Sequence, residues 1–288
     1  MKFYNDIDET EVQQHIKEID YSGYTKVENF LSIEGKDHLL SLINKRYKKI
    51  NELASGDKMK YPGLTSRNEN DKIICSLYHI DYCFIDLLSS DPIRKIAMPK
   101  LNDEYYRFLP QHLPNYILSY YNARSSGNKL DMHIDSNILF LSDQKTNVIQ
   151  VALLLEDSTI DIGCKVVVLG SQNLGRYTDK EFCNTKPLSR KAGDLIIWDS
   201  RLWHGTLANK TRESRWALIA TLSKWWCKQS IDIVRNLDND IYQLCSDEQK
   251  QLLRFCSIPP KDEFQRNNTK TGYDFFKKNV DDYEYLLL

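Results

Sequence analysis

The chain has 288 residues, of which 41% are hydrophobic and 27% are charged, as in an ordinary globular protein. Its formal net charge is −1 and it has no basic block, which argues against a nucleic-acid-binding surface. Seven scattered cysteines without C-x-x-C spacing are typical of reduced thiols and not of a disulfide framework. The polar N-terminus and the lack of a run of roughly 20 apolar residues predict a cytoplasmic protein without a signal peptide or membrane span.

The first 115 residues are predicted to be mainly helical. Residues 8–19 have the composition of a helix, residues 21–31 alternate in the manner of a strand, and residues 32–53 carry apolar side chains at helical spacing. Residues 54–72 are polar and contain glycine and proline, so we expect a long loop there. A second helical region is expected over residues 80–109, with breaks near Pro92 and Pro99.

The pattern then changes to short apolar runs that are rich in β-branched and aromatic residues. These runs are YILSYYNA, NVIQVALLLE, CKVVVLGS, DLIIWDS and RWALIATLSKWW, and polar loops separate them. Such a succession predicts an antiparallel sandwich or barrel over residues 116–226. Residues 227–288 return to a helical composition, so we interpret residues 1–288 as one domain with a β core and flanking helices.

The stretch DMHIDSN places His133 and Asp135 two residues apart. In an extended segment alternate side chains point the same way, so these two would share a face and suit a divalent metal. An isolated H-x-D pair is more often a surface pair than a metal site, and a third ligand is therefore needed. Of the six histidines, His204 is the other one in the β region. Two histidines and one carboxylate on one face form the iron site of non-haem oxygenases.

Arg215 follows His204 by eleven residues, with the turn-forming residues Asn209 and Lys210 between them. A hairpin centred on that turn would bring the His204 and Arg215 strands side by side. Taken alone, Arg215 would be interpreted as a surface arginine. Because a guanidinium matches a carboxylate in bidentate fashion, Arg215 beside a metal corner instead predicts a site for the distal carboxylate of 2-oxoglutarate.

The pattern resembles the phytanoyl-CoA dioxygenase family of Fe(II)- and 2-oxoglutarate-dependent oxygenases, over about residues 19–223. The stretches that carry the resemblance are DYSGYTKVENFLS, VALLLEDSTIDIGCKVVVLGSQ and AGDLIIWDSRLWHGTLANKTRESRWAL. The last of them matches the family at Gly193, Asp194, His204, Gly205, Thr206, Asn209, Arg215 and Ala217. Leu169 and Gln172 depart from the proline and histidine that are common in the family, and neither position is a metal ligand.

The resemblance implies a double-stranded β-helix (a cupin-like jelly roll) with helices outside it. It implies His133, Asp135 and His204 as catalytic iron ligands, and Arg215, assisted by the Thr206 hydroxyl, as the residues that bind 2-oxoglutarate. The cofactors would be Fe(II), 2-oxoglutarate as cosubstrate, and O2. Relatives that halogenate lack the carboxylate, so Asp135 argues for hydroxylation or another oxidation.

The function predicted is a dioxygenase that hydroxylates a small molecule and releases succinate and CO2. The alternatives are a protein or peptide side-chain hydroxylase with the same chemistry, or a non-catalytic jelly-roll binding domain. We expect the substrate to enter over the barrel mouth, where the 54–72 loop and the strand around Tyr120 and Tyr121 are candidate walls. The basic side chains of that loop are expected either to be solvated or to contact an anionic substrate; they are Lys58, Lys60 and Arg67. The residues reveal neither the substrate nor the oligomeric state.

Overall fold

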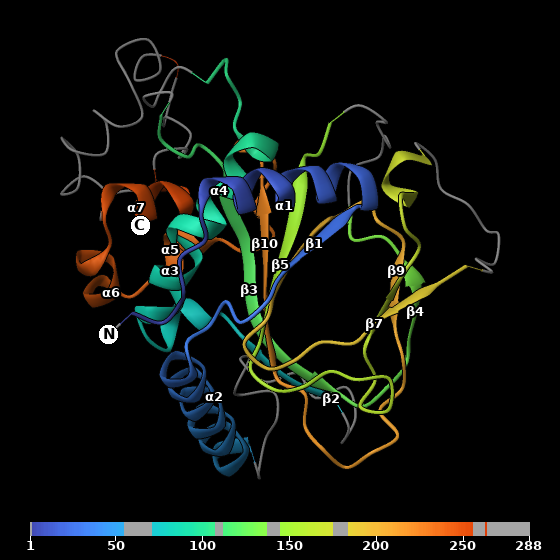
Figure 1. The fold of residues 1–288 in the computed structure, drawn as a ribbon. Coiled ribbons are helices and arrows are strands. Elements are labelled where there is room, and N and C mark those ends of the chain that lie inside the picture. The colour runs from blue at the N-terminus through green and yellow to red at the C-terminus, as the bar shows by residue number, and fades with distance from the viewer. Residues whose placement is uncertain are drawn as a thin grey trace.

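Two antiparallel β-sheets face each other, and helices cover the outer face of the larger sheet (Figure 1). The computed structural model describes residues 2–54, 71–106, 112–136, 145–174, 184–255 and 263. The two sheets form a double-stranded β-helix of the cupin-like type, which confirms the fold expected from the resemblance.

The larger sheet has six strands in the order β1–β8–β5–β10–β3–β2, and the smaller has four in the order β4–β9–β6–β7. The strands of the larger sheet are β1 (Tyr24–Val27), β2 (Asp71–Cys75), β3 (Ile117–Ser126), β5 (Val148–Leu154), β8 (Leu195–Asp199) and β10 (Ala217–Ser223). Those of the smaller sheet are β4 (Leu130–His133), β6 (Lys165–Val167), β7 (Lys186–Leu188) and β9 (His204–Thr206). The smaller sheet therefore consists of strands of only three or four residues.

The helices lie mainly in the first hundred residues and after the last strand. They are α1 (Glu9–Ser22), α2 (Ile33–Ala54), α3 (Cys83–Leu88), α4 (Asp91–Leu101), α5 (Ile233–Asn236), α6 (Asn239–Leu244) and α7 (Asp247–Leu252), with short 3-10 helices at Leu77–His79 and Ser171–Leu174. A capping box formed by Asp8 and Glu11 begins α1, and Gly23 ends it at φ +84°. Glycine adopts this left-handed conformation without strain, and the conformation lets the chain leave the helix and enter β1 at the next residue.

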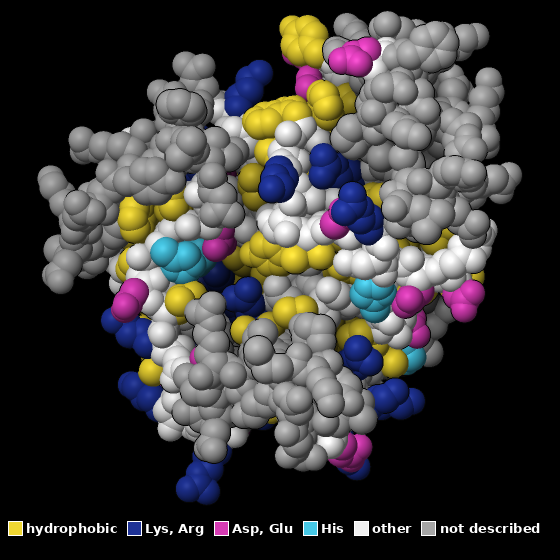
Figure 2. All heavy atoms as spheres, turned by 180° about the vertical axis from the view of Figure 1, so that it is seen from behind, with side chains coloured by type: hydrophobic (Ala, Val, Ile, Leu, Met, Phe, Trp, Pro, Cys, Tyr) yellow, Lys and Arg dark blue, Asp and Glu magenta, His cyan; other side chains and the backbone are white. Residues whose placement is uncertain are grey.

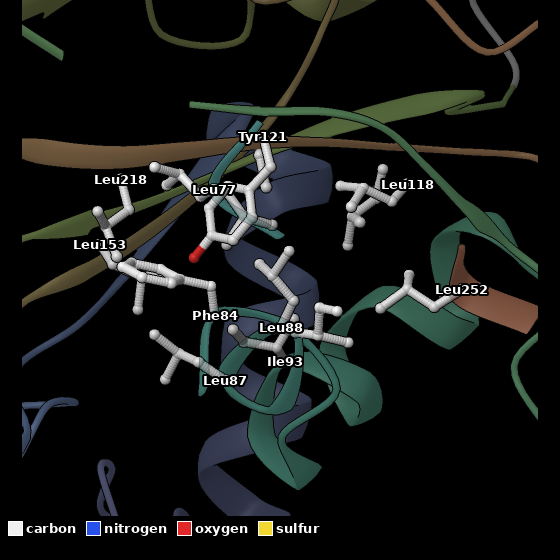
Figure 3. Close-up of a cluster of buried hydrophobic side chains, with 14 of the residues drawn as sticks. Leu77, Phe84, Leu87, Leu88, Ile93, Leu118, Tyr121, Leu153, Leu218 and Leu252 are labelled. Atoms are coloured by element: carbon white, nitrogen blue, oxygen red, sulfur yellow. The ribbon is translucent and has the colours of Figure 1, made fainter. Parts of the chain in front are cut away.

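Alternation along the central strands divides their side chains between two layers. In β5, Val151 and Leu153 face the helices, whereas Ala152 and Leu154 face the smaller sheet. Figure 3 shows how the helices pack on the larger sheet. Phe84 and Leu88 of α3 and Ile93 of α4 lie against side chains of the sheet, which are Tyr121, Leu153 and Leu218. Burying each leucine contributes roughly 1.5–3 kcal/mol, so this layer stabilises the sheet that carries the site on its opposite face.

Two expectations need correction. The His204 and Arg215 segments do not form a hairpin, because β9 pairs with β4 and β6 whereas β10 pairs with β3 and β5. The break expected near Pro99 is also wrong, because this proline lies inside α4, which continues to Leu101. Pro92, by contrast, occupies the first turn of α4, where its missing N–H costs nothing. One strand was not expected: β2 pairs with the end of β3.

Within the described ranges, no helix has both the length and the apolar character to cross a bilayer. On the face shown in Figure 2, the described Lys and Arg side chains are scattered among acidic, hydrophobic and other side chains and do not form one basic patch. The five cysteines in the described part of the chain are all free thiols.

Candidate metal and keto-acid site

His133, Asp135 and His204 converge although seventy residues separate the first from the last. His133 ends β4, His204 begins β9, and the two are direct cross-strand partners. Asp135 follows two residues after β4, with Oδ1 at 3.6 Å from Nε2 of His133 and Oδ2 at 3.4 Å from Nε2 of His204. One ligand atom from each residue lies within 4.8 Å of the other two, which is close enough for all three to hold one ion.

Backbone contacts orient both imidazoles. Nδ1 of His133 lies 2.8 Å from the carbonyl oxygen of Asp131, and Nδ1 of His204 lies 2.9 Å from that of Leu202. Since a carbonyl only accepts, each Nδ1 carries the proton and each Nε2 presents a lone pair to the centre. This tautomer is the one that a metal-binding histidine needs.

Asp135 is held from two sides. Its backbone N–H donates to the carbonyl of Ser200 at 2.9 Å, just beyond the end of β8. Its Oδ2 accepts a hydrogen bond of 3.3 Å from the indole Nε1 of Trp198. The carboxylate is thus fixed to the larger sheet while the two histidines belong to the smaller one.

The charge states suit a divalent cation. Burial alone would raise the pKa of Asp135, but the contact with His133 and the nearby His204 and Lys165 outweigh it and lower the pKa below its usual range. Burial and the ammonium of Lys165 lower the pKa of His204, so this imidazole is neutral at pH 7. The contact with Asp135 raises the pKa of His133. Two imidazole nitrogens and one carboxylate are a ligand set that fits a first-row metal such as Fe(II).

A cavity of about 340 Å³ lies between the sheets, and the three candidate ligands line it. Thr206 and Arg215 line the same cavity, although the hairpin expected to bring Arg215 there does not exist. Nε of Arg215 donates to the carbonyl of Ser126, and its Nη2 lies 3.5 Å from that of Asn128. Arg215 therefore reaches the site from the segment that crosses between the two sheets, before β10 begins.

The cavity is rich in cations. Besides Arg215 it is lined by Arg124, Lys129, Lys165 and Arg190, against the two carboxylates of Asp71 and Asp135. Arg190 is 8% exposed, and its Nε and Nη2 are buried without a hydrogen-bond partner among the described residues. Asp71 accepts hydrogen bonds from Ser126 and Asn128. The fixed charge of this cavity is therefore suited to an anionic occupant.

The sequence located some of these residues and missed others. Of the expected wall residues, Tyr120 lines the cavity, whereas Tyr121 is buried in the helical layer. Lys58, Lys60 and Arg67 lie outside the described residues. Two features of the site were not foreseen. Lys165 is marked in the sequence only as a lysine at the start of the apolar run KVVV. The contact between Trp198 and Asp135 is marked only by a tryptophan in a buried strand.

A model of the phytanoyl-CoA dioxygenase family matches residues 19–217, which include all five of the predicted site residues. The chain belongs to the phytanoyl-CoA dioxygenase family. Membership in this family supports 2-oxoglutarate-dependent dioxygenase chemistry, and the converged side chains are the ones that such chemistry needs.

Curated relatives of this phytanoyl-CoA dioxygenase family member include the uncharacterized proteins Mb1539 of Mycobacterium bovis and Rv1501 of Mycobacterium tuberculosis. Each is 28% identical over 129 residues, which are 43% of this chain and 47% of the relative. The chain thus spans about half the length of the curated relatives it matches.

Solved structures share the fold of this family member. HygX from Streptomyces hygroscopicus, with nickel, 2-oxoglutarate and hygromycin B bound, is 13% identical with a TM-score of 0.56, over 75% of this chain and 89% of HygX. The 2-oxoglutarate-dependent epimerase SnoN from nogalamycin biosynthesis is 16% identical with a TM-score of 0.55, over 75% and 84% of the two chains. AviO1 from Streptomyces viridochromogenes is 15% identical with a TM-score of 0.55, over 78% and 98%. At these identities the likeness supports the fold alone.

Proposed function

We propose that this protein is an Fe(II)- and 2-oxoglutarate-dependent dioxygenase that hydroxylates a small molecule with release of succinate and CO2. The observation that carries the proposal is the convergence of His133, Asp135 and His204 on the wall of a cavity that Arg215 and Thr206 also line. The overall reaction balances as substrate C–H, O2 and 2-oxoglutarate giving substrate C–OH, CO2 and succinate.

Each residue has a defined task in this proposal. His133, Asp135 and His204 would hold the ion on one side and leave the opposite side open. Activation of O2 is the chemistry that a ferrous ion supplies in such a site. Arg215 and Thr206 would bind the distal carboxylate of the keto acid, which orients its keto group towards the ion, and the apolar wall of Ile196, Ala152 and Ile219 would exclude water.

Hydroxylation of a small molecule is the finer part of the proposal. Asp135 completes a three-residue ligand set, which favours oxygen transfer over halogenation, and the cavity volume suits a keto acid with part of a small substrate. HygX binds hygromycin B, which supports a small-molecule substrate. SnoN is an epimerase and SnoK a carbocyclase, so proteins of this fold differ in the reaction they carry out. Hydroxylation of a protein or peptide side chain is the alternative.

Anaerobic addition of Fe(II) and 2-oxoglutarate to the full chain tests the site before any substrate is known. A weak visible charge-transfer band is expected for the native protein and for His79→Ala, and is expected to vanish in His204→Ala. His79 is a suitable control because it bonds to Asp238 and does not line the cavity. A native protein that binds Fe(II) but develops no band with the keto acid would sink the proposal.

Product analysis then tests the role of the carboxylate. Asp135→Ala is expected to abolish substrate-dependent succinate release in a screen of small molecules, whereas Asp131→Ala is expected to retain it. Asp131 lies on the same strand segment, but its carboxylate is 89% exposed and pairs with Lys129. Succinate release that depends on a peptide and on no small molecule would favour the alternative substrate class.

A further inference from the structure

Lys165 occupies the position directly opposite Thr206 in the smaller sheet. We propose that it is a second cationic anchor for the distal carboxylate of 2-oxoglutarate, acting beside Thr206 and Arg215 and giving the site its preference for a keto diacid. This inference rests on the proposed function and names a binding residue that the family resemblance did not supply.

The register of the sheet brings Lys165 next to the expected keto-acid site. Lys165 of β6 and Thr206 of β9 are cross-strand partners, and both side chains line the cavity. Directly paired residues have Cβ atoms about 5 Å apart, so an anion that accepts from the Thr206 hydroxyl lies within reach of the lysine stem. Arg215 is close as well, because its Nη1 lies beside Gly163, two residues before Lys165.

Among the described residues no carboxylate pairs directly with the ammonium of Lys165, and Asp135 acts on it only as a nearby charge. Its Nζ lies 3.9 Å from the centre of the Trp198 ring, and three guanidinium groups line the same cavity. Burial of a cation is costly unless an anion compensates it, and a ring face compensates only in part. The arrangement of charges therefore favours an incoming anion at this point.

Arg215 by itself does not offer enough hydrogen-bond donors to satisfy a carboxylate. Its Nε donates to the Ser126 carbonyl, and its Nη2 faces the Asn128 carbonyl, so two of its three nitrogens are directed to the β3–β4 turn. These contacts use two of its five N–H donors, and the three that remain are fewer than the roughly four lone-pair sites of a carboxylate. Lys165 and Thr206, on the adjacent strands, supply the further donors.

The position of Lys165 and Thr206 along their strands favours the distal carboxylate of 2-oxoglutarate, and not a group of the substrate, as the anion that they bind. Thr206 lies two residues from His204 on the same face of β9, so the Lys165–Thr206 pair is one pleat removed from the metal ligands, on the side towards Arg215. A keto acid held by the ion at one end and by Arg215 at the other would pass this pair. A substrate carboxylate bound by Lys165 is the competing outcome that the experiment must separate.

Calorimetry with Mn(II)-loaded protein under anaerobic conditions provides that separation. The ligands are 2-oxoglutarate and 2-oxovalerate, which carries a methyl group in place of the distal carboxylate. Lys165→Met is expected to raise the Kd of 2-oxoglutarate about tenfold or more and to change that of 2-oxovalerate little, because only the former loses a charge-assisted hydrogen bond. Lys165→Arg is expected to restore most of the affinity for 2-oxoglutarate.

Lys186→Met is the matched control, since Lys186 is an exposed lysine on neighbouring β7 that does not line the cavity. An unchanged Kd of 2-oxoglutarate in Lys165→Met would overturn the inference. Binding of a substrate group would then be the remaining role for Lys165. An equal loss for both keto acids would also overturn it. If circular dichroism shows that Lys165→Met does not fold, the Kd of 2-oxoglutarate is compared instead among the native protein, Lys165→Arg and Lys165→Gln. The same criteria then apply. A native protein that binds Mn(II) but neither keto acid would instead refute the proposed function.

Discussion

The indole nitrogen of Trp198 lies 3.3 Å from Oδ2 of Asp135, so a strand of the larger sheet directly contacts the carboxylate of the candidate metal site. Partners of this kind fix the orientation of metal ligands, and their loss typically weakens metal binding 10- to 100-fold. We therefore expect Trp198→Phe, which keeps the packing, to raise the Kd of Mn(II) about tenfold in calorimetry. Trp226→Phe changes a half-exposed indole and should leave it unchanged. Equal metal affinity in the two variants would contradict this role for Trp198.

Asp199 and Arg201 support the turn that positions Asp135. Arg201 donates to both carboxylate oxygens of Asp199, whose side chain is 2% exposed, and the intervening Ser200 carbonyl accepts from the backbone of Asp135. Breaking a buried pair leaves an uncompensated charge, so Arg201→Met is expected to cost roughly 3–5 kcal/mol in urea unfolding. Arg212→Met, at an exposed position, should cost less than about 0.5 kcal/mol. The idea fails if both variants unfold at the same urea concentration.

Gly163 makes room for Arg215. Its φ is +88°, and a Cβ there would lie 2.5 Å from the Leu207 carbonyl and 2.9 Å from Nη1 of Arg215. Gly163→Ala is expected to lower stability by about 1–3 kcal/mol and to raise the Kd of 2-oxoglutarate in calorimetry. Gly170→Ala is the control for backbone strain alone, with φ +73° and its nearest neighbour at 3.5 Å. It should lose stability but keep the Kd of the native protein.

Ligands that bind only the folded state must stabilise this protein. At a free concentration one hundred times the Kd, one ligand adds about 2.7 kcal/mol to the free energy of unfolding. We expect Mn(II) to raise Tm, and 2-oxoglutarate to raise it further only when Mn(II) is present. The second increase should disappear in Arg215→Met, as measured by differential scanning calorimetry. A keto-acid effect without metal would place the acid elsewhere.

Local signals revealed the parts of the site that lie close together in the chain. His133 and Asp135 share a face through strand alternation, and Arg215 follows His204 at a spacing typical of the family. The start of α1 lies one residue from the start of the helix expected over residues 8–19, but its end was missed: α1 continues to Ser22, and Gly23, which was expected inside a strand, ends it. The roles assigned to the five site residues stay predictions, although the structure brings all five to one cavity.

Contacts that depend on pairing between distant strands were not readable. The Lys165–Thr206 pair exists because β6 pairs with β9, and no feature within either segment encodes that register. The false hairpin has a related cause. Asn209 and Lys210 do turn the chain, but their backbone N–H groups donate to Gly127 and Asp161, in loops that adjoin the smaller sheet. A turn signal shows where the chain bends and leaves open which strands it joins.

His204 and Thr206 stand on one face of a three-residue strand, with only Gly205 between them. Two residues along a pleated strand span about 6.6–6.8 Å, so the backbone of β9 fixes the Cα spacing between one proposed ion ligand and one of the proposed carboxylate anchors. That Cα spacing does not depend on the outer loops, because both residues belong to one short strand. In the proposed function, this strand would set how far the Thr206 end of the cosubstrate lies from the ion, while cavity residues on other strands would contact the molecule to be oxidised.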